Sequence, residues 1–258
     1  MDLIEAKHKT NIERHPWEYA RFEVLKHFLN KEIIQNKTNP TIIDIGCGDS
    51  FVVESISKLY PQANLIAVDT AFTPEIIEFY KQKLQNKHIS FYDHIDEVPS
   101  TINADCILLM DVIEHIEKDI LFLNLVREKT FTTSETKWFI TVPAYQNLFC
   151  MHDTFLGHFR RYNNDMLITH TTKAHLKTLK VGYFFFSLLL PRYIQVQKEK
   201  LQKQTDSTTG LVEWNAGSFK TNFIKTILVI DFKITSFFQV IGIKLPGLSN
   251  YMICQKSV

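Results

Sequence analysis

The sequence predicts an α/β fold built on a doubly wound, mostly parallel sheet. Three observations support this prediction. Short apolar segments typical of strands alternate with segments typical of amphipathic helices. The first of these strands ends in a turn containing a glycine pair, and a helix follows at once. The chain of 258 residues is 45% hydrophobic, which is enough for one sizeable core.

The first strand, residues 41–45, organises the rest of the chain. It runs into the turn Gly46-Cys47-Gly48-Asp49-Ser50, and residues 51–60 are expected to form a helix. A strand, a tight turn and a helix N-terminus in this order commonly form a nucleotide pocket. Glycine at positions 46 and 48 permits unusual backbone angles and lets a ligand lie against the backbone.

The turn favours S-adenosylmethionine (SAM) over a dinucleotide. A dinucleotide site needs a small residue at the sixth position of its glycine motif, where this chain has Phe51. Asp49 would also place a negative charge near a diphosphate. SAM carries no phosphate, and its sulfonium and amino groups suit the acids Asp44 and Asp49.

Three further strands each end at an acid. Residues 64–68 precede Asp69, residues 88–92 precede Asp93, and residues 104–110 precede Asp111. An acid at the tip of the second strand can accept both ribose hydroxyls, in NAD and in SAM alike. Helices are expected at residues 73–85 and 119–129, and a fifth strand at residues 137–143.

An amphipathic helix is expected at residues 11–35, before the first strand. It packs on the main domain or covers the ligand. In the second case Trp17, Tyr19 and Arg21 would close the pocket against water.

Several motifs together resemble the class I SAM-dependent methyltransferases. Residues 44–48 resemble the first motif of that family, although Ser50 stands where the family often has a third glycine. Residues 111–115 resemble the Asp-x-x-Glu-His segment of many members, including the ubiquinone type. Residues 110–116, 142–144 and 152–162 together resemble a bacterial branch (methyltransferase-23 or ubiquinone-like) that is often encoded near glycan-assembly genes.

This resemblance implies a Rossmann-like sheet of seven strands with helical additions. Two more strands are then expected near residues 179–186 and 250–255, the last one antiparallel. The resemblance also gives Asp93 a contact with adenine, with His94 and Asp96 as alternatives. The expected cofactor-binding residues are Asp44, Gly46, Gly48, Asp69, Asp93 and Asp111.

Residues 151–162 are the densest chemical segment, with two histidines, two arginines, one acid and three aromatic residues. A loop with only a structural role seldom needs so many such side chains. Methyl transfer to a hydroxyl needs a base, and histidine suits that task. The expected catalytic residues are His152, His158 and His115, the last with a packing role as the alternative.

The same segment is expected to contact the acceptor. Arg160 and Arg161 could bind a carboxylate or phosphate, or one of them could pair with Asp153 or Asp165 to hold the loop. His152, Asp153 and His158 could also bind a metal, but they lack a recognised spacing, so no metal is expected. The expected acceptor-binding residues are Trp17, Tyr19, Arg21, Tyr145, Arg160, Arg161 and Tyr162.

Composition sets limits on partners and location. A net charge of +1 gives no support for nucleic-acid binding. Four widely spaced cysteines and a charged N-terminal segment indicate a cytoplasmic protein with reduced thiols. We divide the chain into a helical lid (1–36), a SAM-binding core (37–190) and a helical cap with the final strand (191–258).

The C-terminal third is expected to cap the sheet with helices. Residues 223–243 are long enough to span a bilayer, but Lys225, Asp231 and Lys233 interrupt them. The alternative is a surface that docks on a membrane and reaches a lipid-linked acceptor. Residues 205–218 are polar and are expected to form a loop.

The sequence as a whole indicates a SAM-dependent O-methyltransferase that acts on a small or sugar-like acceptor, with the arginine pair favouring an anionic one. A nucleotide-dependent oxidoreductase and a SAM-binding module without turnover are the alternatives. The oligomeric state stays open.

Overall fold

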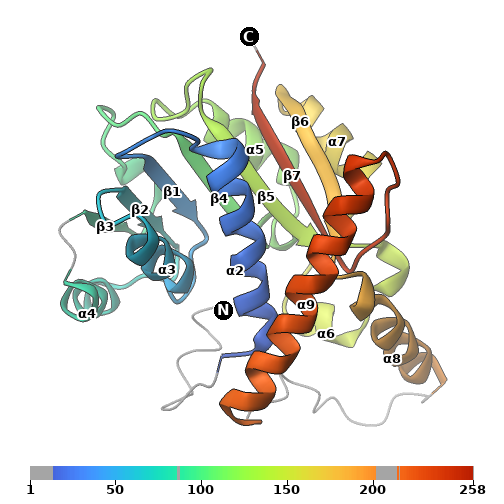
Figure 1. Ribbon diagram of the computed structural model, residues 1–258. Helices are drawn as coiled ribbons and strands as arrows, with labels where there is room; N and C mark the ends of the chain where they lie inside the picture. Colours follow the sequence, from blue (N-terminus) through green and yellow to red (C-terminus); the bar gives the residue numbers. More distant parts are fainter. Residues whose placement is uncertain (1–13, 86–87, 202–213, 215, 258) are drawn as a thin grey trace.

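A seven-stranded sheet forms the centre of the protein (Figure 1), in the order β3-β2-β1-β4-β5-β7-β6. The computed structural model describes residues 14–85, 88–201, 214 and 216–257. All pairings from β3 to β5 are parallel, and β7 pairs antiparallel with β5 and β6. The strands are β1 (Thr41–Ile45), β2 (Asn64–Val68), β3 (Ile89–Tyr92), β4 (Cys106–Met110), β5 (Lys137–Pro143), β6 (Leu176–Phe184) and β7 (Ser249–Lys256).

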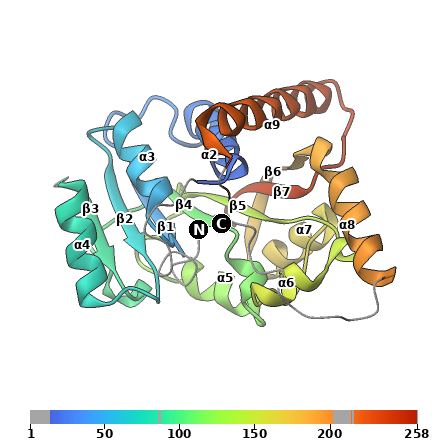
Figure 2. The ribbon, with the colours of Figure 1, turned by 90° about the horizontal axis from the view of Figure 1, so that it is seen from below.

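Helices cover both faces of this sheet. Figure 2 shows α2, α3 and α9 on one face and α5 and α7 on the other. The helices are α2 (Pro16–Phe28), α3 (Phe51–Leu59), α4 (Pro74–Leu84), α5 (Asp119–Arg127), α6 (Met151–Phe155), α7 (Asn164–Lys173), α8 (Leu189–Leu201) and α9 (Gly217–Val240). No helix among the described residues is long and apolar enough to cross a membrane.

Alternation along β1 separates two hydrophobic cores. Ile43 and Ile45 pack with α5 and α7, while Ile42 packs with α2 and α3. Side chains two residues apart on a strand share a face. Asp44 therefore lies on the same face as Ile42, beneath α2 and α3. This places a carboxylate inside the apolar layer close to the end of β1.

The N-terminal helix α2 has well-defined starting signals. His15 is the N-cap and accepts a hydrogen bond from the backbone of Trp17, while Glu18 completes a capping box, and Pro16 occupies the first turn. Its buried face ends at Phe28, whose ring lies 4.4 Å from that of Tyr251 in β7. Helix α2 is thus fixed across the middle of the sheet.

The fold predicted from the sequence is confirmed, including the antiparallel last strand. Three boundaries differ. The first helix ends at Phe28 and continues as a π-helix over Leu29–Ile33. Strand β6 begins at Leu176, before the expected start at residue 179, because β7 pairs with it from that residue onward. Of the polar segment 205–218, residues 217 and 218 belong to α9, and most of the others lie outside the described residues.

Candidate functional site

The turn after β1 adopts the strained backbone that its glycines permit. Gly46, Gly48 and Ser50 all have positive φ, at 72°, 54° and 60°. A Cβ on Gly46 would lie 2.7 Å from a methyl group of Val112. The Gly46 amide also donates to the carbonyl of Val68 in β2. Glycine at position 46 therefore lets the turn fit between the ends of β2 and β4.

Asp69, at the tip of β2, faces this turn. Its carboxylate accepts hydrogen bonds from the Gly48 amide at 2.8 Å and from the Ala71 amide at 2.9 Å. These bonds fix the orientation of the carboxylate, and each oxygen keeps a further lone pair. Asp69 is thus held in a position where it can accept hydrogen bonds from a ligand at the turn.

Asp44 is a buried acid whose hydrogen bonding is incomplete. Only 3% of the residue is exposed, and Oδ2 has no hydrogen-bond partner among the described residues. Burial, and then the nearby charge of Asp69, raise its pKa to about 8. A buried unpaired carboxyl group of this kind needs an explanation. A cationic ligand at the end of β1 would supply the missing partner.

Helix α2 is bonded directly to this edge of the sheet. The Arg21 guanidinium forms an ion pair with Asp111 after β4, and Thr141 donates to the same carboxylate at 2.9 Å. The ring of Trp17 lies 4.5 Å from the Arg21 guanidinium. Burial lowers the pKa of Arg21 to about 10. Of the residues predicted to form a lid, Arg21 therefore contacts a residue predicted to bind the cofactor, and Trp17 packs on Arg21.

A second bond joins the chain before α2 to the turn itself. Arg14 pairs with both Asp49 and Glu18. The charge of Asp49, which the sequence suggested for the cofactor cation, is therefore shared with an arginine. The Tyr19 ring makes an edge contact with Phe51 at 5.6 Å.

The acids predicted to bind the cofactor lie along one edge of the sheet, because each stands in or directly after one of four neighbouring parallel strands. Among them Asp93, directly after β3, is exposed.

Asp153 on α6 is fully buried and is the centre of a second polar network. Its carboxylate receives hydrogen bonds from His158 Nδ1 at 3.0 Å, Arg161 Nε at 2.8 Å, Arg192 at 2.7 Å and the Cys150 amide at 2.9 Å. Burial alone would raise the pKa of Asp153. The hydrogen bond from His158 and the charge of Arg161 outweigh it and hold that pKa well below its usual range. Asp153 is therefore an anion that orients the His158 ring.

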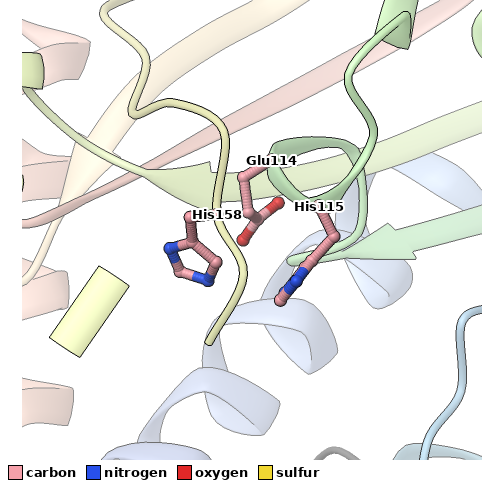
Figure 3. A group of neighbouring side chains, drawn as sticks. All are labelled: Glu114, His115 and His158. Atoms are coloured by element: carbon pink, nitrogen blue, oxygen red, sulfur yellow. The ribbon is translucent and has the colours of Figure 1, made fainter. Parts of the chain in front are cut away.

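Glu114, His115 and His158 converge just beyond β4 and β5 (Figure 3). One potential ligand atom of each lies within 4.8 Å of the others, and the two imidazole rings are 4.5 Å apart. Glu114 is completely buried, and neither carboxylate oxygen has a hydrogen-bond partner among the described residues. Burial raises the pKa of Glu114 to about 8, although the Arg21 charge opposes this.

These three residue types are also ligands for divalent metal ions. The sequence suggested His152, Asp153 and His158 as possible metal ligands, and only His158 of these belongs to the group in the structure. His152 is half-buried on α6, and burial together with the Arg192 charge lowers its pKa.

The arginine pair is engaged within the protein. Arg160 donates to the carbonyls of Ile116 and Glu117 and forms an ion pair with Asp119 at 3.1 Å. Arg161 is buried against Asp153 and also donates to the carbonyl of Ala144. The alternative that one arginine pairs with Asp153 to hold the loop is therefore supported by the contact of Arg161. Both guanidinium groups bond to groups of the protein.

The two tyrosines predicted to bind the acceptor have different surroundings. Tyr162 is fully buried, and its hydroxyl donates to Asp119 at 2.6 Å, beneath the loop. Tyr145 is half-exposed after β5, has a positive φ of 64° and stacks on Tyr183 at 5.1 Å. Of the two, Tyr145 remains accessible to a ligand.

Sequence reasoning missed Arg14, Glu114 and Arg192. Arg14 and Arg192 reach the site from helical additions distant in sequence, so no local spacing marks them. Glu114 stands in the Asp-x-x-Glu-His segment that the sequence analysis quoted, and its burial is visible only in the fold.

Comparison with known proteins gives a sequence relative over part of the chain and structural relatives over most of it. No protein-family model matches the chain. A 93-residue segment is 27% identical to the mitochondrial ubiquinone biosynthesis O-methyltransferase of Candida albicans. This match covers 34% of the chain and only 28% of that relative's length.

Solved structures match almost the whole chain. Phosphoethanolamine N-methyltransferase 2 of Haemonchus contortus, solved with S-adenosylhomocysteine, superposes with a TM-score of 0.55 at 14% identity, over 94% of this chain and 53% of that one. A candidate methyltransferase solved with the Trm112 activator of Haloferax volcanii gives a TM-score of 0.54 at 12% identity, over 94% and 95%. These superpositions confirm the Rossmann-like methyltransferase fold that the motifs predicted.

Proposed function

We propose that this chain, which has the fold of the class I SAM-dependent methyltransferases, is itself a SAM-dependent methyltransferase. The observation that carries the proposal is Asp44, a buried carboxyl with an unpaired oxygen at the end of β1. Its position beside the glycine turn and Asp69 suits a ligand that presents a cation there, as SAM does and as NAD at its diphosphate does not.

Each acid at this edge has a distinct role in the proposal. Asp44 pairs with the amino group of the methionine part, and Asp69 accepts the ribose hydroxyls. Asp93, exposed after β3, contacts adenine. Asp111 and Arg21 connect α2 to the cofactor edge, and Trp17 screens that pair from water. The bound SAM supplies an activated methyl group.

His158 acts as the base in our proposal, and the acceptor is a hydroxyl group on a small or sugar-like molecule. We assign the Nδ1–H of His158 as the donor in its hydrogen bond to Asp153, which leaves Nε2, on the side of the ring toward Glu114 and His115, as the nitrogen that can act as base (Figure 3). This nitrogen can remove the hydroxyl proton as the oxygen attacks the methyl group. His115, 4.5 Å away, would position the acceptor.

The acceptor need not carry negative charge in this proposal. Arg160 and Arg161, the basis for expecting an anion, already bond to groups of the protein. The relatives include an O-methyltransferase and an N-methyltransferase, so the choice of a hydroxyl rests on the His158–Asp153 pair.

Titrations with SAM and with NAD test the cofactor assignment first. We expect SAM to bind and NAD not to bind. Tight NAD binding with no response to SAM would instead support an oxidoreductase.

Incubation with methyl-labelled SAM and hydroxyl compounds tests turnover. We expect His158→Ala to lose about 10²- to 10⁴-fold in rate, with SAM affinity preserved. His158→Gln, which keeps a polar side chain, serves as the matched control and should be equally slow. SAM binding without transfer to any acceptor would support a module without turnover.

A further inference from the structure

Helix α9 carries a long exposed apolar stripe that the sheet and α2 do not cover. Figure 2 shows α9 as the outermost element on its side of the sheet. It packs beside α2, and near its C-terminus Gln239 donates a hydrogen bond to the carbonyl of Val181 in β6. The stripe residues recur every three or four positions, so they share one face. They are Phe219, Phe223, Ile227, Ile230, Ile234 and Phe237, followed by Ile241 at the C-cap, each between 43% and 88% exposed.

The opposite face of α9 is already occupied. Leu228 and Phe232 are buried, and the Phe232 ring lies 5.8 Å from Phe28 of α2. Lys225 forms an ion pair with Glu23 of α2 at 3.7 Å. A surface helix normally has one apolar face and one polar face. Here both faces are apolar, so packing on α2 does not account for the outer stripe.

Charge identifies the kind of partner. The one acid within α9, Asp231, is buried and accepts hydrogen bonds from the amides of Phe186 and Ser187. Lys220 and Lys233 are both exposed. At 100° per residue these lysines flank the stripe on opposite sides. The outer face is therefore apolar in the middle and cationic at its borders.

We propose that α9 docks in the plane of a membrane surface bearing anionic lipids. An amphipathic helix with aromatic and aliphatic residues on one side and lysines at the boundary binds lipid headgroups in this manner. None of the described helices is suited to crossing the bilayer, so the contact is peripheral. A second copy of α9 fits less well, because it offers no exposed carboxylate to either lysine.

This proposal does not depend on the proposed function. It is tested with the full chain by sedimentation with vesicles of phosphatidylcholine alone or mixed with phosphatidylglycerol. The intact protein should bind the mixed vesicles, and added salt should weaken binding. Phe223→Ser combined with Phe237→Ser should lower binding by about tenfold per substitution, because each side chain loses much of its burial in the bilayer.

Matched controls separate the stripe from exposed apolar residues in general. Phe79 on α4 is 58% exposed, close to the 59% of Phe223, and Phe79→Ser should bind vesicles like the intact protein. Lys220→Glu with Lys233→Glu should remove the preference for the mixed vesicles, whereas Lys81→Glu should keep it.

SAM titration and thermal melting should be unchanged in the α9 variants, which shows that the fold and the cofactor site are intact. Failure of the intact protein to bind mixed vesicles, or an equal loss with Phe79→Ser, would overturn the proposal. So would a dimer in solution that Phe223→Ser with Phe237→Ser converts to a monomer, because the stripe would then face a second copy.

Discussion

Replacing Asp44 by asparagine should weaken SAM binding and stabilise the free protein at the same time. The amide keeps the shape of the carboxyl group but cannot ionise. If the carboxylate binds the SAM amino group, its loss removes a hydrogen bond between charged groups, worth about 1.5–3 kcal/mol. The expected loss in affinity at pH 8 is therefore roughly 10- to 150-fold.

The pH dependence follows from the pKa of about 8 for Asp44 in the free protein. A cationic ligand favours the ionised carboxylate, so binding by the intact protein should weaken below pH 8 by up to about tenfold per pH unit. Asp44→Asn should lack this component. The α-amino group of SAM itself loses its proton near pH 8, so affinity should be highest close to that pH.

The stability effect has the opposite sign. Folding raises the pKa of Asp44 above its unfolded value of 3.8. Ionisation of this carboxyl group therefore stabilises the unfolded state more than the folded state. The contribution of Asp44 to the free energy of unfolding is therefore most favourable below pH 3.8, and it is lost as the pH rises toward 8. The penalty at pH 7 is at most about 4 kcal/mol. The new amide also lacks partners, so we expect a net gain of about 1–2 kcal/mol, or roughly 2–8 °C in Tm.

Calorimetric titration with SAM and thermal melting of the free protein, both from pH 5 to pH 8, measure these two effects. The Tm difference between variant and intact protein should grow with pH. Unchanged SAM affinity at pH 8 would refute the pairing of Asp44 with the cofactor. A variant that melts lower than the intact protein throughout would refute the reasoning on its burial.

Other substitutions separate binding, chemistry and stability. Asp69→Ala should weaken SAM binding by about 1.5–3 kcal/mol in calorimetry, since it removes an acceptor of ribose hydroxyls, and an unchanged affinity would contradict that role. His158→Ala should regain part of its activity at high pH, where an acceptor hydroxyl ionises more readily; a flat pH–rate profile would argue against a base. Arg161→Ala should lower the unfolding free energy by about 3 kcal/mol or more in urea, because Asp153 loses a buried partner, while acceptor KM stays constant. A chelator should leave turnover unchanged, and loss of activity restored by a divalent ion would instead assign a metal to Glu114 and its neighbours.

The fold and the row of acids at one edge of the sheet were predictable because they depend on local signals. Parallel strands that end in acids bring those acids to one edge, so Asp69 and Asp111 could be placed from their spacing and the expected topology. The turn at Gly46 was recognisable from its glycines. Its close contact with Val112 was not, because that contact arises between distant strands.

The loop at residues 151–162 shows where sequence reasoning stops. Its density of charged residues indicated a functional segment, but the same residue types serve in ion pairs. Asp153 binds Arg192 of α8, which lies beyond the loop, and Arg160 binds carbonyls after β4. Such partners depend on three-dimensional packing, so the sequence could not tell an acceptor contact from an internal ion pair.

The central claim is that the chain transfers the methyl group of SAM to a hydroxyl with His158 as base. The most direct measurement follows transfer of labelled methyl groups from SAM to hydroxyl compounds and cell extracts, for the intact protein, Asp44→Asn and His158→Ala. We predict labelled product with the intact protein, recovery of Asp44→Asn at high SAM concentration, and little product from His158→Ala at any concentration. Equal product from His158→Ala, or NAD binding with no transfer from SAM, would contradict the account.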